Sequence, residues 1–392
     1  MKRMLSLLAS FVLGSLMAAL AVGASASESN GQLFEPPPVG NAALQYWQAN
    51  LFLYHLDAAQ KKLIEDFDTV PLDGPAAAVV AKRGDLILQY VRRGAHARSC
   101  DWGIPLEEGP NALLPQLNWL HVLCDFQLLC ARGELRNGSD QPAVEDILSA
   151  MALARNTGSD NIGVELRVAD ALENEAIRIA ASGLNRLKPD SVQALKTGLD
   201  QLPPGGSMKR AIRVEQFIGQ RWTIQLLKDS PPGEGWKDKI RNALGNNADA
   251  KIQSAGGTRE QIIANLEKLD PFYDQLEQFA DAPVREFDAK FPALLQQYKS
   301  NPAAPLARLD QFSRLSTQQA AAETRLQMLR AAIEIVQHGP DSVKQTVDRG
   351  GNGLFTYRAT ADGFELRSEL KDANGNPVTL VVGAPPEIRP VK

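Results

Sequence analysis

Cysteine and histidine are scarce in this sequence, with three and four residues respectively among 392. A disulfide framework is excluded, because such proteins are small and rich in cysteine. The four histidines are not spaced as metal ligands, so a metal site is not indicated. They are His55, His96, His121 and His338. We therefore expect no metal and no other cofactor.

Enzyme signatures and basic runs are also missing. The chain has no Gly-rich phosphate loop, no G-x-S-x-G elbow, no H-E-x-x-H helix and no C-x-x-C pair. No basic run exceeds two residues, and the formal net charge is −4. Nucleic-acid phosphates attract basic surfaces, so a mildly acidic chain argues against nucleic-acid binding. We favour a protein that is not an enzyme.

The N-terminus has the anatomy of a secretory signal. Lys2 and Arg3 precede an apolar stretch, Met4–Val22, and small residues follow it up to Ala26. This order predicts a signal peptide cleaved between Ala26 and Ser27. We expect a bacterial periplasmic or extracellular protein that does not contact a membrane after cleavage. Retention of Met4–Val22 as an anchor is the alternative, because the stretch is long enough to span a bilayer.

Apolar residues recur at helical spacing over most of the remaining chain, between short polar turns. This pattern predicts a mainly α fold, an irregular array of antiparallel helical hairpins. From Phe355 to Val382 the period changes to two, with Asp362-Gly363 as a turn. We therefore expect a small C-terminal antiparallel three-stranded β-meander, which should pack on the preceding helix because three strands alone are barely stable.

These changes of pattern divide the chain. The predicted parts are a signal peptide (1–26), a Pro-rich linker (27–40), a helical-hairpin domain (41–229), a flexible loop (230–257), a helical segment (258–339), the β-meander (340–384) and a loose tail (385–392). The loop is inferred from abundant Gly, Pro, Asn and Lys without apolar periodicity. We expect no more than a short helix within it.

Two predicted helices bear on function. In the first, the broad apolar stripe consists of Leu44, Tyr46, Trp47, Leu51, Leu53 and Leu56. Its aromatic residues favour a core role over a platform for a peptide or a sugar: Tyr46, Trp47, Phe52 and Tyr54. The second helix is predicted from Pro110 to Gly133. Its inward stripe consists of Leu113, Leu117, Leu120, Cys124 and Leu128.

All three cysteines lie between Arg92 and Leu135. Cys124 and Cys130 share one predicted helix but face different directions, so they cannot bridge each other. A disulfide from Cys100 to either of them is feasible in an exported protein. Three buried thiols are the alternative, because unpaired cysteine is among the most buried residue types.

Cys100 and His121 are the candidates for a nucleophile and its base. Because His121 lies on the apolar stripe of the second helix, we favour a hydrogen-bonded core histidine instead. Asp101 is a further catalytic candidate. With Trp102 and Gly103 it fits a loop that plugs the helical array: the aspartate caps backbone N–H groups, the tryptophan is buried and the glycine takes an unusual backbone angle.

Glu175 is the remaining catalytic candidate. It continues an apolar line that includes Leu172 and Ile179, and a carboxylate on such a face can act as an acid when burial raises its pKa. A salt bridge to Arg178 or Arg167 is the interpretation we favour.

The order ALQYWQA, CDWG, EGPNALLPQL, AVEDILSAMALAR resembles a group of uncharacterised, signal-bearing helical proteins of planctomycete-type bacteria, over roughly residues 41–220. The resemblance implies export and a helical architecture. LQMLRAAIEIVQHGP followed by FTYRATADGFELRSEL resembles their C-terminal portion, which is itself similar to pseudopilin-type subunits: a long helix, then a small sheet. The signal here lacks the prepilin cleavage pattern.

Together these features predict an exported helical protein with a protein- or peptide-binding or scaffold role in the cell envelope or outside the cell, because helical arrays present extended faces to partners. A secreted hydrolase that uses carboxylates or Cys100 with His121 is one alternative. An envelope-anchored structural subunit is the other.

Overall fold

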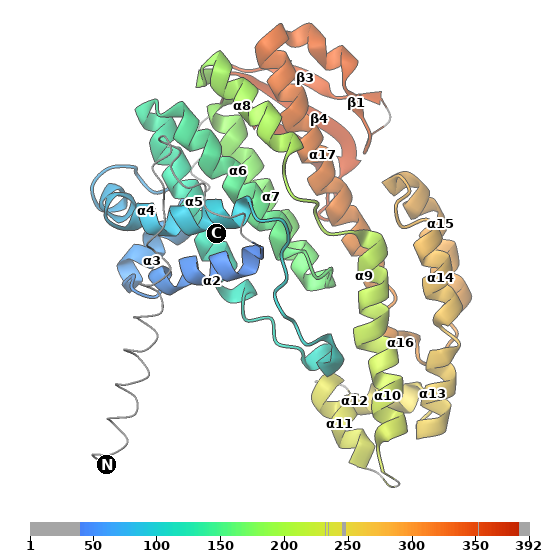
Figure 1. The fold of residues 1–392 in the computed structure, drawn as a ribbon. Coiled ribbons are helices and arrows are strands. Elements are labelled where there is room, and N and C mark those ends of the chain that lie inside the picture. The colour runs from blue at the N-terminus through green and yellow to red at the C-terminus, as the bar shows by residue number, and fades with distance from the viewer. Residues whose placement is uncertain (1–39, 232, 234, 245–247, 352, 384–392) are drawn as a thin grey trace, which may run out of the picture. The chain divides into compact units, whose positions relative to one another are not determined.

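The computed structural model describes residues 40–231, 233, 235–244, 248–351 and 353–383. These residues form a mainly helical fold with a small sheet near the C-terminus, which confirms the predicted fold class (Figure 1). The predicted signal, its cleavage site at Ala26 and Ser27, the linker up to residue 39 and the tail lie outside these ranges. Within them, no helix has the length and apolarity needed to cross a membrane.

The first group of helices is α2 (Ala42–Leu53), α3 (Ala58–Glu65), α4 (Pro75–Ala95), α5 (Leu117–Asn137), α6 (Asp140–Thr157), α7 (Gly163–Gly183) and α8 (Pro189–Asp200). The second group is α9 (Met208–Glu215), α10 (Trp222–Asp229), α11 (Gly235–Leu244), α12 (Ala248–Ser254), α13 (Arg259–Glu267), α14 (Asp270–Gln278), α15 (Val284–Tyr298) and α16 (Ala304–Ala307). The long α17 (Gln311–His338) follows both groups. Short helical turns are η1 (Leu106–Asn111), η2 (Leu184–Arg186), η3 (Gln216–Arg221) and η4 (Pro340–Gln345).

Local sequence explains several helix ends. Asp57 begins α3 with a capping box, because its side chain accepts from the Gln60 amide and the Gln60 side chain accepts from the Asp57 amide. As predicted, α6 is followed by Gly158 and α17 by Gly339. Gly339 has a φ of +89°, a backbone conformation that other residues rarely adopt. A residue with this φ cannot continue the helix, so α17 ends there.

The apolar residues form two cores. The first core joins α2 to α8, the sheet and the second half of α17, and the second core joins α9 to α16 and the first half of α17. Helix α17 therefore serves both cores: Phe312 and Leu315 are buried in the second, and Met328 and Leu329 in the first. Figure 1 shows α17 running from the second group of helices to the sheet.

The sheet confirms the predicted meander. Strands β3 (Thr356–Ala359), β4 (Phe364–Lys371) and β5 (Pro377–Val382) are antiparallel neighbours in that order. A two-stranded ladder of β1 (Val347–Asp348) and β2 (Gly353–Leu354) precedes it. Strands β4 and β5 pack on α17, as expected, and β5 also packs on α7. The buried residues of β4 alternate along the strand and are Phe364, Leu366 and Ser368.

Helix α2 is oriented differently from the prediction. Its buried residues include the small Ala42, Ala43 and Ala49, and of the predicted stripe within the helix only Tyr46 and Leu53 are buried. Leu44 and Leu51 are exposed. Helix α2 approaches α4 closely where Gly94 of α4 leaves room for the Tyr46 ring. The buried face of α2 is therefore not the one with the most large apolar side chains.

Helix α5 begins later than predicted. Gly109 has a φ of +61° and Pro110 follows it, so the chain forms the turn η1 and continues without helix until Leu117. Leu113, expected on the inward face, is 76% exposed. From Leu120 onward the predicted burial is confirmed.

The 230–257 segment was predicted to be a flexible loop, but its described residues are largely helical. Helices α11 and α12 occupy most of it. Trp236, Ile240 and Ile252 are buried in the second core. Few apolar residues are enough to hold these two helices in place. Each helix is short, and it contributes only one side to a core that neighbouring helices complete.

Candidate functional site

The CDWG loop, Cys100–Gly103, is bound to the start of α2 by Asn41. The Asn41 Nδ2 donates to the Asp101 carbonyl at 2.9 Å, and its Oδ1 accepts from the Asp101 amide at 3.0 Å. The Asp101 Oδ1 accepts from the Gly103 amide at 2.8 Å, and Gly103 has a φ of +67°. Both predicted roles are confirmed: the aspartate caps a backbone N–H, and the glycine takes the left-handed conformation.

Trp102 is the plug that the sequence predicted. It is buried, and its Nε1 donates to the Asn156 carbonyl at 2.8 Å. Its ring centroid lies 6.0 Å from Tyr46 and 6.0 Å from Trp119. The Asn156 Nδ2 donates to the Tyr46 Oη at 2.9 Å. These contacts join α2, α5 and α6 through one aromatic cluster. Burial within this cluster raises the pKa of the Tyr46 hydroxyl.

All three cysteines are free thiols in the structure, so neither of the two feasible disulfides from Cys100 is formed in it. Burial raises the pKa of the Cys100 thiol to about 12, although the nearby Ser159 hydroxyl opposes the shift. Burial also raises the pKa of Cys124 and of Cys130. A reactive cysteine needs a lowered pKa, so these thiols are suited to packing.

His121 is exposed, contrary to the prediction of a core histidine. The helical phase of α5 buries Trp119, Leu120 and Leu123, and His121 therefore points away from the first core. Its Nδ1 lies 3.4 Å from the Leu117 carbonyl of its own helix. The groups that influence the Cys100 thiol are instead Ser159, Asp160, Asp101 and the Ala43 backbone. The structure thus does not support a Cys100–His121 pair.

Glu175 makes the salt bridge that the sequence favoured. The Arg178 Nη2 lies 2.6 Å from its Oε2, and the same guanidinium lies 3.2 Å from the Asp68 carboxylate. Arg178 thereby joins α7 to the segment after α3. This arrangement gives Glu175 a structural role.

Helix α7 carries a buried carboxyl group that was not predicted from the sequence. Glu165 is fully buried, and its Oε1 accepts from the Gln116 Nε2 at 2.9 Å. Burial, with the nearby Asp160 carboxylate, raises the pKa of Glu165 to about 8. Burial and Asp101 raise the pKa of Asp160 to about 6. In the sequence, the only indication that Glu165 is buried was its position next to Leu166, on the inward side of the helix.

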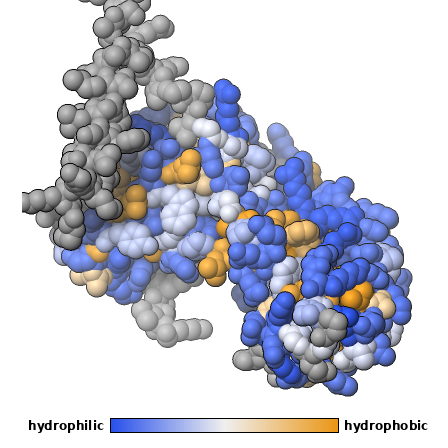
Figure 2. Space-filling model, turned by 60° about the horizontal axis from the view of Figure 1, so that its bottom comes forward, coloured by the Kyte–Doolittle hydropathy of each residue, from blue (hydrophilic) through white to orange (hydrophobic). Residues whose placement is uncertain are grey.

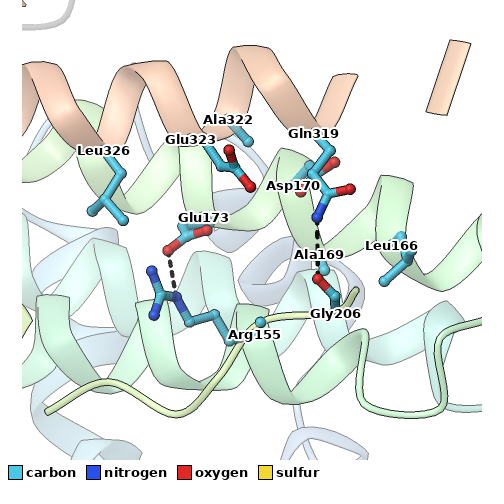
Figure 3. A pocket seen from close by; sticks show the side chains of 11 residues that line it. Arg155, Leu166, Ala169, Asp170, Glu173, Gly206, Gln319, Ala322, Glu323 and Leu326 are labelled. Carbon is cyan, nitrogen blue, oxygen red and sulfur yellow. Dashed lines mark hydrogen bonds and ion pairs between the residues drawn. The ribbon is translucent and has the colours of Figure 1, made fainter. Parts of the chain in front are cut away.

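A pocket of ≈ 170 Å³ lies between α7 and α17 (Figure 3). Arg155 of α6 enters it from below in this view, and its Nε lies 2.7 Å from the Glu173 Oε1. The Gln319 Nε2 donates to the Gly206 carbonyl at 3.1 Å and closes the other end. A Cβ at Gly206 would overlap the end of the Leu166 side chain and lie close to the Gly158 carbonyl, so a larger residue there would displace Leu166.

The pocket is acidic. Burial first, and then the Glu173 and Glu323 carboxylates, raise the pKa of Asp170 to about 7. Burial and Glu173 also raise the pKa of Glu323. The neutral forms of these groups fit the low polarity of their surroundings. The volume is below the roughly 300–1,000 Å³ of ordinary ligand pockets, so we do not assign a substrate to it.

The outward face of α2 carries several large exposed apolar side chains. Leu44 and Leu51 are each 61% exposed, Tyr54 just after the helix is 69% exposed and Trp47 is 36% exposed. We call these four residues the α2 stripe. In Figure 2, orange and white side chains lie among blue ones on the left part of the molecule, which carries α2 in Figure 1. Large contiguous patches of exposed apolar residues are typical of interaction sites.

Trp47 links the α2 stripe to the aromatic cluster. Its ring centroid lies 4.8 Å from that of Trp119, which in turn meets Trp102 of the CDWG loop. The stripe is therefore supported by a rigid, buried base. The predicted core role is confirmed for Tyr46 and is wrong for the exposed Trp47 and Tyr54. Phe52 is partly buried against Tyr90, with ring centroids 5.8 Å apart.

Within the described ranges, no group of three or more His, Cys, Asp or Glu residues is arranged to hold a metal ion. No family model matches the sequence, and no curated protein or solved structure matches it significantly. The resemblance to planctomycete-type signal-bearing proteins stays a prediction.

Proposed function

We propose that this protein is exported and acts by binding another protein chain, with the α2 stripe as the contact surface. The exposure of Leu44, Leu51 and Tyr54 is the observation that carries the proposal. Burial of apolar surface by a partner would stabilise the complex by about 25 cal/mol for each Å² removed from water. The N-terminal signal pattern supports export.

Binding is preferred to the hydrolase alternative on three grounds. The Cys100 thiol has a raised pKa and does not pair with His121. Glu175 is held in a salt bridge by Arg178. The acidic pocket beside Asp170 is small for a substrate. By contrast, the α2 stripe combines aromatic and aliphatic side chains on a supported helix, as interface centres do.

The test is site-specific photo-crosslinking in living cells. A photoreactive residue replaces Leu51, and a second protein carries it at Val347, which is 62% exposed on β1 and serves as the matched control. We expect one reproducible protein adduct from position 51 and none from position 347. The captured chain is then purified, and Leu51→Glu should weaken its binding about tenfold or more, because a charge would be buried in the contact.

Two results would overturn the proposal. One is equal labelling from positions 51 and 347, which would mark the α2 stripe as ordinary surface. The other is unchanged affinity in Leu51→Glu while circular dichroism shows an intact fold.

A further inference from the structure

The α2 stripe is symmetric along the helix. Leu44 and Tyr54 lie five positions on either side of Ala49, and Trp47 and Leu51 lie two positions on either side of it. The intervals of three, four and three residues are those of a coiled-coil seam. A two-fold axis passing beside Ala49 would therefore superimpose the stripe on itself in an antiparallel arrangement.

Such an arrangement would pair unlike shapes. Leu44 of one copy would meet Tyr54 of the other, and Trp47 would meet Leu51, so each aromatic ring would face a leucine. An isologous contact of this kind needs a self-complementary patch, which the spacing provides.

Charge also favours a second copy as the partner. The helix sequence AALQYWQANLFL contains no acidic and no basic residue. Two identical charged faces would repel each other, whereas two copies of α2 would not. A helix that selected a charged partner segment would be expected to carry complementary charges beside its apolar stripe, and α2 has none.

We propose that the α2 stripe binds the α2 stripe of a second copy of this chain in an antiparallel two-fold dimer. This inference rests on the proposed binding function and names its partner. The helix has 12 residues and is about 18 Å long, so the seam is short. Stable interfaces bury about 800 Å² per partner, and a smaller contact of this kind should give a dissociation constant on the order of micromolar.

The experiment is a charge-pair rescue on the purified full chain, read as molecular mass by sedimentation over a range of concentrations. Leu44→Lys and Tyr54→Glu are made separately. Both side chains are more than half exposed, so the fold should survive. We expect each variant alone to weaken dimerisation about tenfold or more. Mixing the two should restore a heterodimer, because the new opposite charges face each other across the axis.

A mismatched mixture serves as the register control. Leu51→Lys with Tyr54→Glu would place the charges about 10 Å apart along the seam, since seven residues separate them there. This mixture should stay monomeric. Equal rescue by both mixtures would overturn the proposed register, and Val347→Glu should dimerise as the wild type does.

The dimer and the binding function fail in different ways. A wild-type chain that is monomeric at all concentrations overturns the dimer. If position 51 then crosslinks to a different protein in cells, the binding function stands. If it crosslinks to no protein, both proposals fall.

Discussion

Gly109 and Gly103 show how one residue type serves two purposes. Both have positive φ, +61° and +67° respectively. A Cβ on Gly103 would meet open space, whereas a Cβ on Gly109 would overlap the Trp222 ring. We therefore expect Gly103→Ala to cost about 1 kcal/mol, from backbone strain alone. Gly109→Ala should cost about 2 kcal/mol more, because η1 must also move away from Trp222.

The measurement is the free energy of unfolding in urea for the two variants. Gly103→Ala is the matched control, since it changes the same residue type in the same left-handed region. Equal losses in both variants would show that the contact between Gly109 and Trp222 does not hold η1 in place.

Single residues were predictable where their chemistry is local. Asp101 and Gly103 follow rules of turn geometry that act within three residues, and both predictions are confirmed. His121 and Tyr54 were placed wrongly, because their exposure depends on the rotation of a whole helix. Glu165 was not predicted to be buried, because its burial is decided by the helices that surround α7.

At the scale of elements, α11 and α12 replace the predicted loop. Trp236 is buried in the second core and is the largest apolar side chain of the two helices. We expect Trp236→Ala to cost about 3–5 kcal/mol locally. The segment should then open, and trypsin should cleave it at Lys237, Lys239 or Lys251 on the order of tenfold faster.

Limited proteolysis followed by mass spectrometry measures this opening. Phe217→Ala is the control, because Phe217 is 44% exposed and should leave the rate unchanged. Rapid cleavage of the wild-type chain in this segment, at the rate of Trp236→Ala, would contradict the helical assignment.

The β-meander and the α2 helix differ in how far sequence could predict them. Period-two alternation from Phe364 and the Asp362-Gly363 turn specify the sheet directly, and the register Tyr357 to Leu366 agrees. In α2, apolar residues occur on both faces. Which face is buried is decided by packing against other helices, such as the contact of Gly94 on α4 with the Tyr46 ring.

At the scale of the whole molecule, buried carboxyl groups should set the response to pH. Burial is the first cause of raised pKa values in five of them: Asp125 and Glu165 to about 8, Asp146 and Asp170 to about 7, and Asp160 to about 6. Their ordinary values are 3.8 for aspartate and 4.5 for glutamate. Between the ordinary and the raised values, the folded chain binds more protons than the unfolded chain.

The free energy of unfolding should therefore fall as pH rises. The contribution of these groups is fully present below about pH 4 and is lost as pH passes through 6 to 8. We expect Tm to fall on the order of 5 °C between pH 5 and pH 8.5. Glu165→Gln should reduce this fall, because the amide stays neutral and keeps the oxygen that accepts from Gln116.

Calorimetry of the wild type, Glu165→Gln and the exposed-site control Glu107→Gln measures the effect. A Tm that rises from pH 5 to pH 8.5, or identical slopes in all three proteins, would contradict this account.

The sequence by itself determined the class of this fold, its hairpin organisation, the helix stops at Gly158 and Gly339, and the meander. Each of these depends on periodicity or on the conformational limits of residues within a few positions of one another. Only the tertiary structure decided that α17 serves two cores, that Glu165 is buried and that the α2 stripe is exposed. The physical reason is that burial depends on which distant helices approach, and that is decided by the shape and volume of both surfaces together.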